Sequence, residues 1–189
     1  TRLDLAWHTS DSNQVGIHEF AAWCDTVDTQ MMLAINLGSR GLDEARNFLE
    51  YVNGPTGSYW GDLRKKNGRA DPFDVKLWCL GNEMDGPWQI GRLQAREYGR
   101  KARDVAQQMR VIDPALQLIA CGSSGTFMPT YLTWDREVLE ECYDMVDGIY
   151  RLMQSDLEGA VNIGNPEYVS VKELVETCLL YTSDAADEE

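Results

Sequence analysis

Residues 75–88 read V-K-L-W-C-L-G-N-E-M-D-G-P-W, an apolar run of strand length that ends at a glycine and leads into a polar loop. Three further segments begin with the same apolar character: 30–36 (Q-M-M-L-A-I-N), 116–121 (L-Q-L-I-A-C) and 143–149. Short apolar runs bounded by glycine are typical of strands buried on both faces, as in parallel sheets. The sequence therefore predicts a parallel sheet built from these segments.

Amphipathic segments lie between the apolar runs. Residues 18–25, 43–52 and 96–112 repeat apolar side chains at helical spacing. Alternation of strands and helices is typical of the α/β class, which is the fold class we predict. The linker 53–74 is long and rich in Gly, Pro and aromatic residues, so we expect a functional loop in which Tyr59 either lines a wall or fills space.

The composition restricts the classes of partner. The chain has 189 residues, 43% of them apolar, with a formal net charge of -14 at pH 7 and a pI near 4.5. Such an acidic surface repels phosphate backbones and anionic lipids, so we expect no nucleic-acid partner and no membrane partner. Residues 31–35, the longest apolar run, are too few to span a bilayer.

The cysteines and histidines do not form a metal motif. None of the five cysteines belongs to a C-x-x-C pair, and His8 and His18 are ten residues apart. We therefore expect no metal site. Scattered cysteines in apolar surroundings are typical of buried free thiols, which fits a reducing compartment.

The loop after residues 75–80 carries the chemistry. Glu83 lies at the carboxyl end of a predicted parallel strand, where the catalytic groups of (β/α)8 barrels occur. In retaining glycoside hydrolysis, one carboxylic acid protonates the leaving oxygen and a second carboxylate attacks the anomeric carbon. We expect Trp78 and Trp88 to supply an apolar setting that raises the pKa of the acid. In the alternative interpretation, Asn82 is only a helix N-cap and Glu83 only a partner of the helix dipole.

Four stretches of the chain resemble glycoside hydrolase family 51, the intracellular-type α-L-arabinofuranosidases. They are R-L-D-L-A-W (2–7), M-M-L-A-I-N-L-G-S-R-G (31–41), G-S-Y-W-G-D-L-R (57–64) and K-L-W-C-L-G-N-E-M-D-G-P-W-Q-I-G (76–91). The resemblance runs from residue 2 to residue 149. It implies a retaining (β/α)8 hydrolase that needs no cofactor and removes terminal arabinofuranosyl groups from plant polysaccharides and oligosaccharides. The expected partner is therefore an arabinofuranosyl-containing oligosaccharide.

The resemblance also implies roles for individual residues. Glu83 resembles the general acid/base of the family, and Asn82 resembles the asparagine that hydrogen-bonds the 2-hydroxyl of the sugar. Trp7 resembles a tryptophan that contacts the leaving-group side. Trp88 either lines the cleft or packs within its loop, and Asn36 either faces the cleft or satisfies loop backbone groups.

The family pattern makes the four apolar runs the third to the sixth strand of the barrel. The predicted architecture is thus an incomplete (β/α)8 barrel over residues 1–149. The seventh strand, which carries the nucleophilic glutamate in the family, does not occur in the sequence, and neither Asp85 nor Asp135 (which we place in a loop) has an equivalent position. We expect an α-L-arabinofuranosidase fragment that is inactive as written, with apolar faces uncovered and strand edges unpaired.

The sequence changes character after residue 149. Residues 150–177, with a predicted strand at 160–164 and a predicted helix at 171–177, resemble the C-terminal portion of an NAD-dependent nucleotide-sugar epimerase, although no G-x-G-x-x-G loop is present. Residues 178–189 resemble a translated sequencing adapter and form an artefactual or disordered acidic tail. The hypothesis is a chimera of three pieces. The alternative is a divergent protein with an acidic tail.

Two other functions stay open at this point. One is an epimerase or other NAD-dependent oxidoreductase, which only the C-terminal segment supports. The other is a non-catalytic carbohydrate-binding remnant that uses Trp7 and Trp88. By analogy with the family, the full-length parent is expected to be cytoplasmic and homo-oligomeric.

Overall fold

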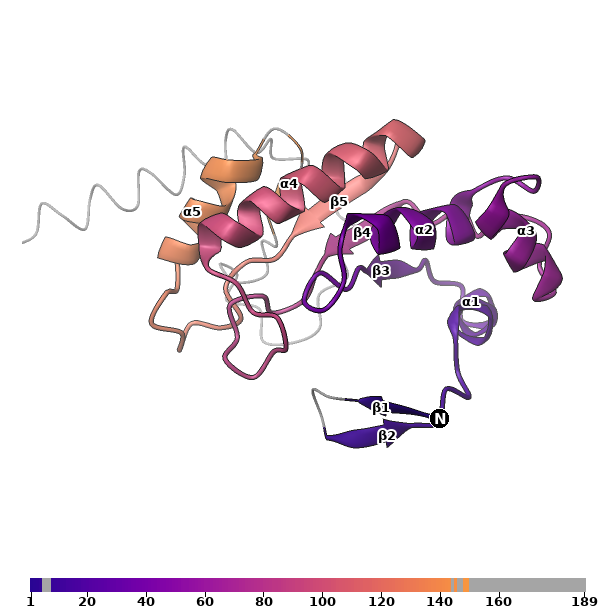
Figure 1. Cartoon of the computed structure of the whole chain (residues 1–189), viewed down its shortest axis with the longest axis horizontal. Helices are drawn as coiled ribbons and strands as arrows, with labels where there is room; N and C mark the ends of the chain where they lie inside the picture. Colours follow the sequence, from indigo (N-terminus) through magenta and orange to yellow (C-terminus); the bar gives the residue numbers. More distant parts are fainter. Residues whose placement is uncertain (5–7, 144, 146–147, 150–189) are drawn as a thin grey trace, which may run out of the picture.

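The central sheet consists of parallel strands that follow one another in chain order, β3-β4-β5-β6 (Figure 1). It is seen in a computed structural model that describes residues 1–4, 8–143, 145 and 148–149. The strands are β3 (Met32–Ala34), β4 (Leu77–Leu80), β5 (Gln117–Ala120) and β6 (Gly148–Ile149). The register pairs Ala34 with Cys79 and Cys79 with Ile119. The predicted α/β class and parallel sheet are confirmed, with strands shorter than the apolar runs that predicted them.

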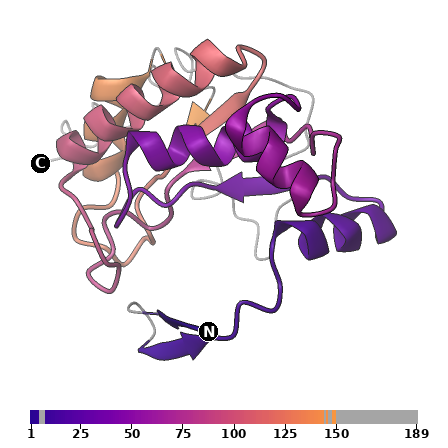
Figure 2. The same ribbon diagram turned by 45° about the vertical axis from the view of Figure 1, so that its right-hand side comes forward.

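The structure describes five helices around the sheet. They are α1 (Ile17–Thr26), α2 (Leu42–Asn53), α3 (Tyr59–Lys66), α4 (Ala95–Ile112) and α5 (Thr133–Cys142). Both views show α2 and α4 on the same face of the sheet (Figures 1 and 2), and α5 packs beside α4 while α3 packs against α2. The three predicted helices agree with α1, α2 and α4 to within one residue at each end.

Trp78 belongs to the core between the sheet and these helices. Its side chain is fully buried, and its Nε1 donates a hydrogen bond to the carbonyl oxygen of Val75 at 2.9 Å. Its ring forms a T-shaped contact with Phe48 of α2, with the ring centroids 5.5 Å apart. Side chains alternate between the two faces of a strand, so Trp78 and Leu80 face the helices while Cys79 faces the other side. The expectation that Trp78 flanks Glu83 is therefore wrong.

The linker 53–74 is not the long loop that its composition predicts, because it contains α3. The Ser58 hydroxyl caps this helix by accepting a hydrogen bond from the Gly61 amide at 3.2 Å. From α3, the fully buried guanidinium of Arg64 donates to the carbonyl oxygens of Tyr51 and Gly54, each at 2.8 Å. A cation at the carboxyl end of α2 complements the helix dipole and satisfies orphan carbonyl groups. The segment thus stabilises the helix layer.

A β-hairpin precedes the helices and was not predicted. Its strands β1 (Arg2–Asp4) and β2 (Thr9–Asp11) pair in antiparallel fashion, and in both views they stand apart from the sheet (Figure 2). Their side chains are mostly exposed and polar, so they show no apolar alternation from which a strand could be predicted.

Several predictions concern residues outside the described part of the chain. These are the position of Trp7, the strand at 160–164, the helix at 171–177 and the segments 150–177 and 178–189. Residues 148–149 do pair with β5, as the apolar run at 143–149 predicts.

Tyr98 of α4 joins the carboxyl ends of β4 and β5. Its hydroxyl donates to the carbonyl oxygen of Leu80 at 2.6 Å and accepts from the amide of Cys121 at 2.7 Å. The ring is fully buried and stacks on Trp134 of α5 with centroids 5.7 Å apart. Burial raises the pKa of Tyr98 well above its ordinary value, so the hydroxyl stays protonated and can serve both partners.

Replacing Tyr98 with phenylalanine should destabilise the fold. The substitution keeps the ring but leaves a buried carbonyl and a largely buried amide without this partner, which costs about 1–3 kcal/mol in the free energy of unfolding. Urea denaturation of Tyr98→Phe measures the loss. Tyr59→Phe, at a hydroxyl on a 77% exposed side chain, is the control, and an equal loss in the two variants would contradict the assigned role.

Candidate active site

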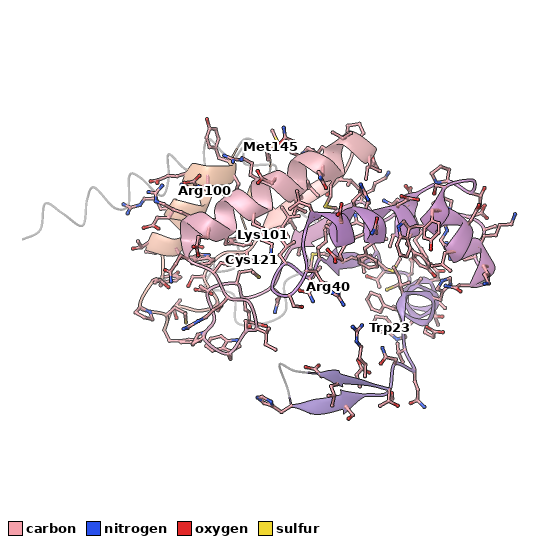
Figure 3. The ribbon with its side chains drawn as sticks, viewed as in Figure 1. Trp23, Arg40, Arg100, Lys101, Cys121 and Met145 are labelled. Carbon is pink, nitrogen blue, oxygen red and sulfur yellow. The ribbon has the colours of Figure 1, made fainter. Side chains whose placement is uncertain are left out.

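A cavity of about 410 Å³ lies at the carboxyl ends of β4 and β5. Pockets that bind small molecules have volumes of about 300–1,000 Å³. Side chains from the sheet face opposite the helices and from the loops after β4 and β5 form its wall. The lining residues are Met32, Ala34, Cys79, Gly81, Asn82, Glu83, Ile119, Ala120, Cys121, Gly122, Ser123 and Ser124. Cys121 comes directly after β5 (Figure 3) and borders the cavity with its half-buried side chain.

The loop after β4 brings Glu83 to this cavity through an unusual backbone path. Gly81 and Glu83 both have positive φ angles, 101° and 46°, and Met84 between the loop and the core is only 3% exposed. The left-handed conformation costs a residue with a side chain roughly 1–2 kcal/mol. Such conformations persist where the surrounding contacts hold them, and they cluster at functional sites. Here the buried Met84 and a hydrogen bond from the Leu93 amide to the Met84 carbonyl, at 3.0 Å, hold the loop.

The Glu83 carboxylate has two neighbouring donors from its own loop. Trp88 Nε1 donates to Glu83 Oε2 at 2.7 Å, and Gln89 Nε2 donates to the same oxygen at 3.1 Å. Trp88 thus contacts the carboxylate. The interpretation of Asn82 as a helix N-cap is wrong, because the next helix begins only at Ala95 with Gln94 as its N-cap.

Asp85 ties the loop after β4 to the loop after β5. It is 9% exposed, and it accepts hydrogen bonds from the Ser123 hydroxyl at 2.7 Å and the Ser124 amide at 3.0 Å, as well as from the Ser124 hydroxyl. Asp85 is not one of the described residues that line the cavity. Its supporting role went unrecognised, because its partners are nearly forty residues away in the sequence.

Asp135 supports the same serine loop from α5. The prediction that it lies in a loop is wrong, since it belongs to the first turn of α5. Its Oδ1 accepts from the Ser123 amide at 3.0 Å, while its Oδ2 is buried without a hydrogen-bond partner among the described residues. Burial raises the pKa of Asp135 above its ordinary value, and the charge of Asp85 adds to the effect.

Two other predicted site residues, Asn82 and Asn36, differ in their surroundings, and His18, which was not predicted to belong to the site, lies elsewhere. Asn82 is exposed and lines the cavity. Asn36 is also exposed, but its side-chain oxygen accepts from the Ser39 amide at 3.0 Å, its amide group donates to the Ser39 hydroxyl at 3.0 Å, and it is not one of the described lining residues. His18 forms a 2.7 Å hydrogen bond with the hydroxyl of Tyr51, so it joins α1 to α2.

The described residues offer neither a cluster of metal ligands nor a helix that could span a membrane. They contain no group of three or more His, Cys, Asp or Glu side chains that could hold a metal ion. Among the helices that the structure describes, none combines the length and the apolar character that a membrane crossing requires.

Known proteins with similar sequences cover most of the chain. Residues 1–156 match the family model described as alpha-L-arabinofuranosidase 1 domain. An intracellular exo-alpha-(1->5)-L-arabinofuranosidase 1 from Bacillus subtilis is 54% identical over 148 residues, which are 78% of this chain and 30% of that protein. A relative of the same description from Halalkalibacterium halodurans is 53% identical over 148 residues. The chain therefore spans about a third of the length of the curated relatives it matches.

Solved structures agree with the sequence matches. A family 51 alpha-L-arabinofuranosidase from Bifidobacterium longum superposes with a TM-score of 0.76 at 47% identity, covering 78% of this chain and 29% of that one. The alpha-L-arabinofuranosidase of Thermotoga maritima, solved as an arabinose complex, superposes with a TM-score of 0.72 at 39% identity, covering 78% of this chain and 30% of that one. Strand order and helix layer are thus those of a known fold.

Removing the Asp85 carboxylate should weaken the connection between the loop after β4 and the loop after β5. Asp85→Ala leaves the Ser123 hydroxyl and the Ser124 amide without their charged acceptor, so we expect the free energy of unfolding to fall by about 2–4 kcal/mol. Chemical denaturation measures the change. Asp25→Ala, at an exposed position on α1, serves as the control. A decrease in the free energy of unfolding below 1 kcal/mol, roughly the net contribution of one ordinary hydrogen bond, would contradict the proposed connection between the loops.

The raised pKa of Asp135 predicts a pH-dependent effect. A carboxyl group whose folded-state pKa is raised stabilises the fold below its ordinary value of 3.8 and loses that contribution as the pH rises through the folded pKa. Asp135→Asn removes the buried charge, so the variant should be more stable than the unmodified chain at pH 7, with the difference vanishing below pH 3.8. Thermal unfolding from pH 3 to pH 7 tests this. A difference of constant size across that range would count against it.

Proposed function

The chain belongs to the alpha-L-arabinofuranosidase 1 domain family, and we propose that residues 1–149 are part of the catalytic domain of a retaining α-L-arabinofuranosidase with Glu83 as its general acid/base. One observation carries the proposal. Glu83 lines a cavity at the carboxyl ends of parallel strands and accepts a hydrogen bond from Trp88 at 2.7 Å. This is the edge of the sheet at which barrel enzymes carry their catalytic groups.

The sheet supports an arc of a (β/α)8 barrel as the wider architecture. Its strands are parallel and in consecutive order, and α2 and α4 cover one face while the cavity opens on the other (Figures 1 and 2). Doubly wound sheets instead reverse the strand order and carry helices on both faces. We propose that β3 to β6 are the third to the sixth strand of such a barrel.

The hydrogen bonds of Glu83 favour one oxygen as the proton carrier. Trp88 and Gln89 both donate to Oε2, so this oxygen acts as an acceptor. In a protonated carboxyl group the hydrogen is then on Oε1, which is the oxygen that would protonate the departing sugar. After the transfer, both donors stabilise the carboxylate, which is ready to take a proton from water in the second half of the reaction.

The remaining site residues are proposals of the same kind. We propose that Asn82, exposed at the cavity, hydrogen-bonds the 2-hydroxyl of the arabinofuranosyl group, and that Trp7 contacts the leaving-group side. A contact from Asn36 would require it to exchange its two hydrogen bonds with Ser39. The substrate is then an arabinofuranosyl-containing oligosaccharide, as the names of the relatives suggest.

The retaining reaction needs a second carboxylate about 5–5.5 Å from the first. Glu83 is the one carboxylate among the described residues that line the cavity. We therefore propose that the 189 residues alone do not turn over arabinofuranosides. Since relatives are named intracellular enzymes, we also propose that the parent protein is cytoplasmic. That it is a homo-oligomer is a proposal by analogy with the family alone.

The division after residue 149 is likewise a proposal. In this proposal the epimerase-like segment covers residues 150–177 and the adapter-like tail begins at residue 178, while the family match extends to residue 156, past the proposed junction. Long-read sequencing of the source DNA across codons 140–189 tests the chimera. No observation on the described residues favours an epimerase activity.

A hybrid enzyme tests the role of Glu83. Residues 2–149 replace the matching stretch of the Bacillus subtilis relative, and the hybrid is assayed on α-(1→5)-L-arabinotriose and on 4-nitrophenyl α-L-arabinofuranoside. We expect Glu83→Gln to lower kcat/KM on arabinotriose by about 10²- to 10⁴-fold, the usual contribution of general acid catalysis. The loss on the nitrophenyl substrate should be much smaller, because 4-nitrophenolate leaves without a proton.

The control is Asp25→Asn, a carboxylate on α1 at an exposed position, which should leave both rates unchanged. Equal losses on the two substrates would argue against proton donation by Glu83. Hydrolysis by the isolated 189 residues would disprove the need for a carboxylate from elsewhere.

A further inference from the structure

We propose that Cys121 is a positioning residue, whose sulfur fixes the start of the loop that carries Glu83. The inference rests on the proposed function, because it explains how the acid/base is held at the cavity. Cys121 (labelled in Figure 3) follows β5 directly and lines the same cavity as Glu83. In the sequence it is only one of several scattered cysteines, so its role depends on contacts that the fold creates.

The thiol of Cys121 reaches across to the last residue of β4. Its Sγ donates a hydrogen bond to the carbonyl oxygen of Leu80 at 3.6 Å. The hydroxyl of Tyr98 donates to the same carbonyl and accepts from the amide of Cys121. These contacts close a ring in which both the backbone and the side chain of Cys121 take part. Because a thiol is a weak donor, we expect its hydrogen bond to affect the geometry of the loop more than the stability of the fold.

The same sulfur lies against the backbone of the loop after β4. A Cβ atom added to Gly81 would lie 3.5 Å from Cys121 Sγ and 2.9 Å from Cγ of Met84. Gly81 has a φ of 101°, and Glu83, two residues later, has a φ of 46°. The first left-handed residue of the loop is therefore packed against both the sulfur and Met84.

The surroundings of the thiol favour a positioning role over covalent chemistry. Burial raises the pKa of Cys121 to about 12, and the neighbouring Cys79 adds to the effect. The thiol therefore keeps its proton at neutral pH, donates to Leu80 and brings no charge to the cavity wall. Since the thiolate is the nucleophilic form of cysteine, a thiol held in its protonated form is a poor nucleophile.

A small displacement at Leu80 is passed to Glu83, because only two residues separate them. A general acid must come within about 2.6–3.2 Å of the atom to which it gives its proton. A misplacement of about 1 Å can lower a rate by about 10²-fold. A side chain that holds the first residues of the loop therefore acts on the rate through Glu83, without touching the substrate itself.

The hybrid enzyme that carries residues 2–149 provides the test. Cys121→Ala removes both the donor and the contact with Gly81, so we expect kcat/KM on α-(1→5)-L-arabinotriose to fall by about ten- to hundredfold. On 4-nitrophenyl α-L-arabinofuranoside the loss should be less than about threefold, because this leaving group needs no proton from Glu83. Cys121→Ser keeps a donor at the position and should recover most of the activity on arabinotriose.

A spectrum of the 189-residue chain tests the position of the carboxylate without any substrate. Trp88 Nε1 donates to Glu83 Oε2 at 2.7 Å, so the indole N–H resonance, assigned by its loss in Trp88→Phe, depends on where the carboxylate lies. We expect this resonance to shift in Cys121→Ala. The matched control is Cys24→Ala, which removes a buried thiol from α1 and should change neither the resonance nor the ratio of the two rates.

Each remaining outcome has a definite meaning. Equal losses on the two substrates in Cys121→Ala, or no loss on either, would overturn the positioning role. If the loss selective for arabinotriose occurs in Glu83→Gln but not in Cys121→Ala, the positioning role fails and the proposed function survives. If Glu83→Gln shows no selective loss while the Trp88 resonance still shifts in Cys121→Ala, the proposed function fails and Cys121 still positions the carboxylate. Should Cys121→Ala not fold, Cys121→Val fills the space of the sulfur without donating a hydrogen bond, and its selective loss or the lack of one decides in the same way.

Discussion

A single buried hydroxyl holds the two strands that carry the candidate site at their carboxyl ends. Where β4 and β5 part into separate loops, the ladder of hydrogen bonds between them ends, and Tyr98 satisfies the carbonyl of Leu80 and the amide of Cys121 at that point. Unpaired buried backbone groups would be costly there. The side chain of Asp85 continues the same connection a few residues further, between the loops themselves. The position of Glu83 depends on both connections.

The helix layer is built so that α5 can reach this region. Gly99 lets the backbones of α4 and α5 approach closely, because a Cβ atom there would come within 3.0 Å of the Val138 carbonyl oxygen. Arg100 (labelled in Figure 3) pairs with Glu141 of α5 at 3.1 Å, and this side-chain hydrogen bond lowers the pKa of Glu141. The surface ion pair itself stabilises little, but the close packing orients the first turn of α5. Asp135 is thereby brought to the amide of Ser123.

The sequence predicted those parts of the fold that have local signals. The apolar runs and the long helical periods identified the sheet, α1, α2 and α4. In α5, Trp134, Val138 and Leu139 follow helical spacing and could have identified the helix, whereas α3 is short and its largest contribution, Arg64, acts on carbonyl groups that no sequence pattern indicates. The motif around Glu83 was found from its place after β4. Asp85 and Asp135 were not, because they act only through contacts between segments that are distant along the chain.

The positive φ angle of Glu83 sets the conformational stability of the loop against the proposed catalytic role of its side chain. Glycine adopts that angle without strain, so a glycine at this position would remove the strain from the backbone. A protein selected only for resistance to unfolding would discard the glutamate. We propose that Glu83 is kept at this angle, despite the strain, because the proposed acid/base chemistry requires its side chain at the cavity.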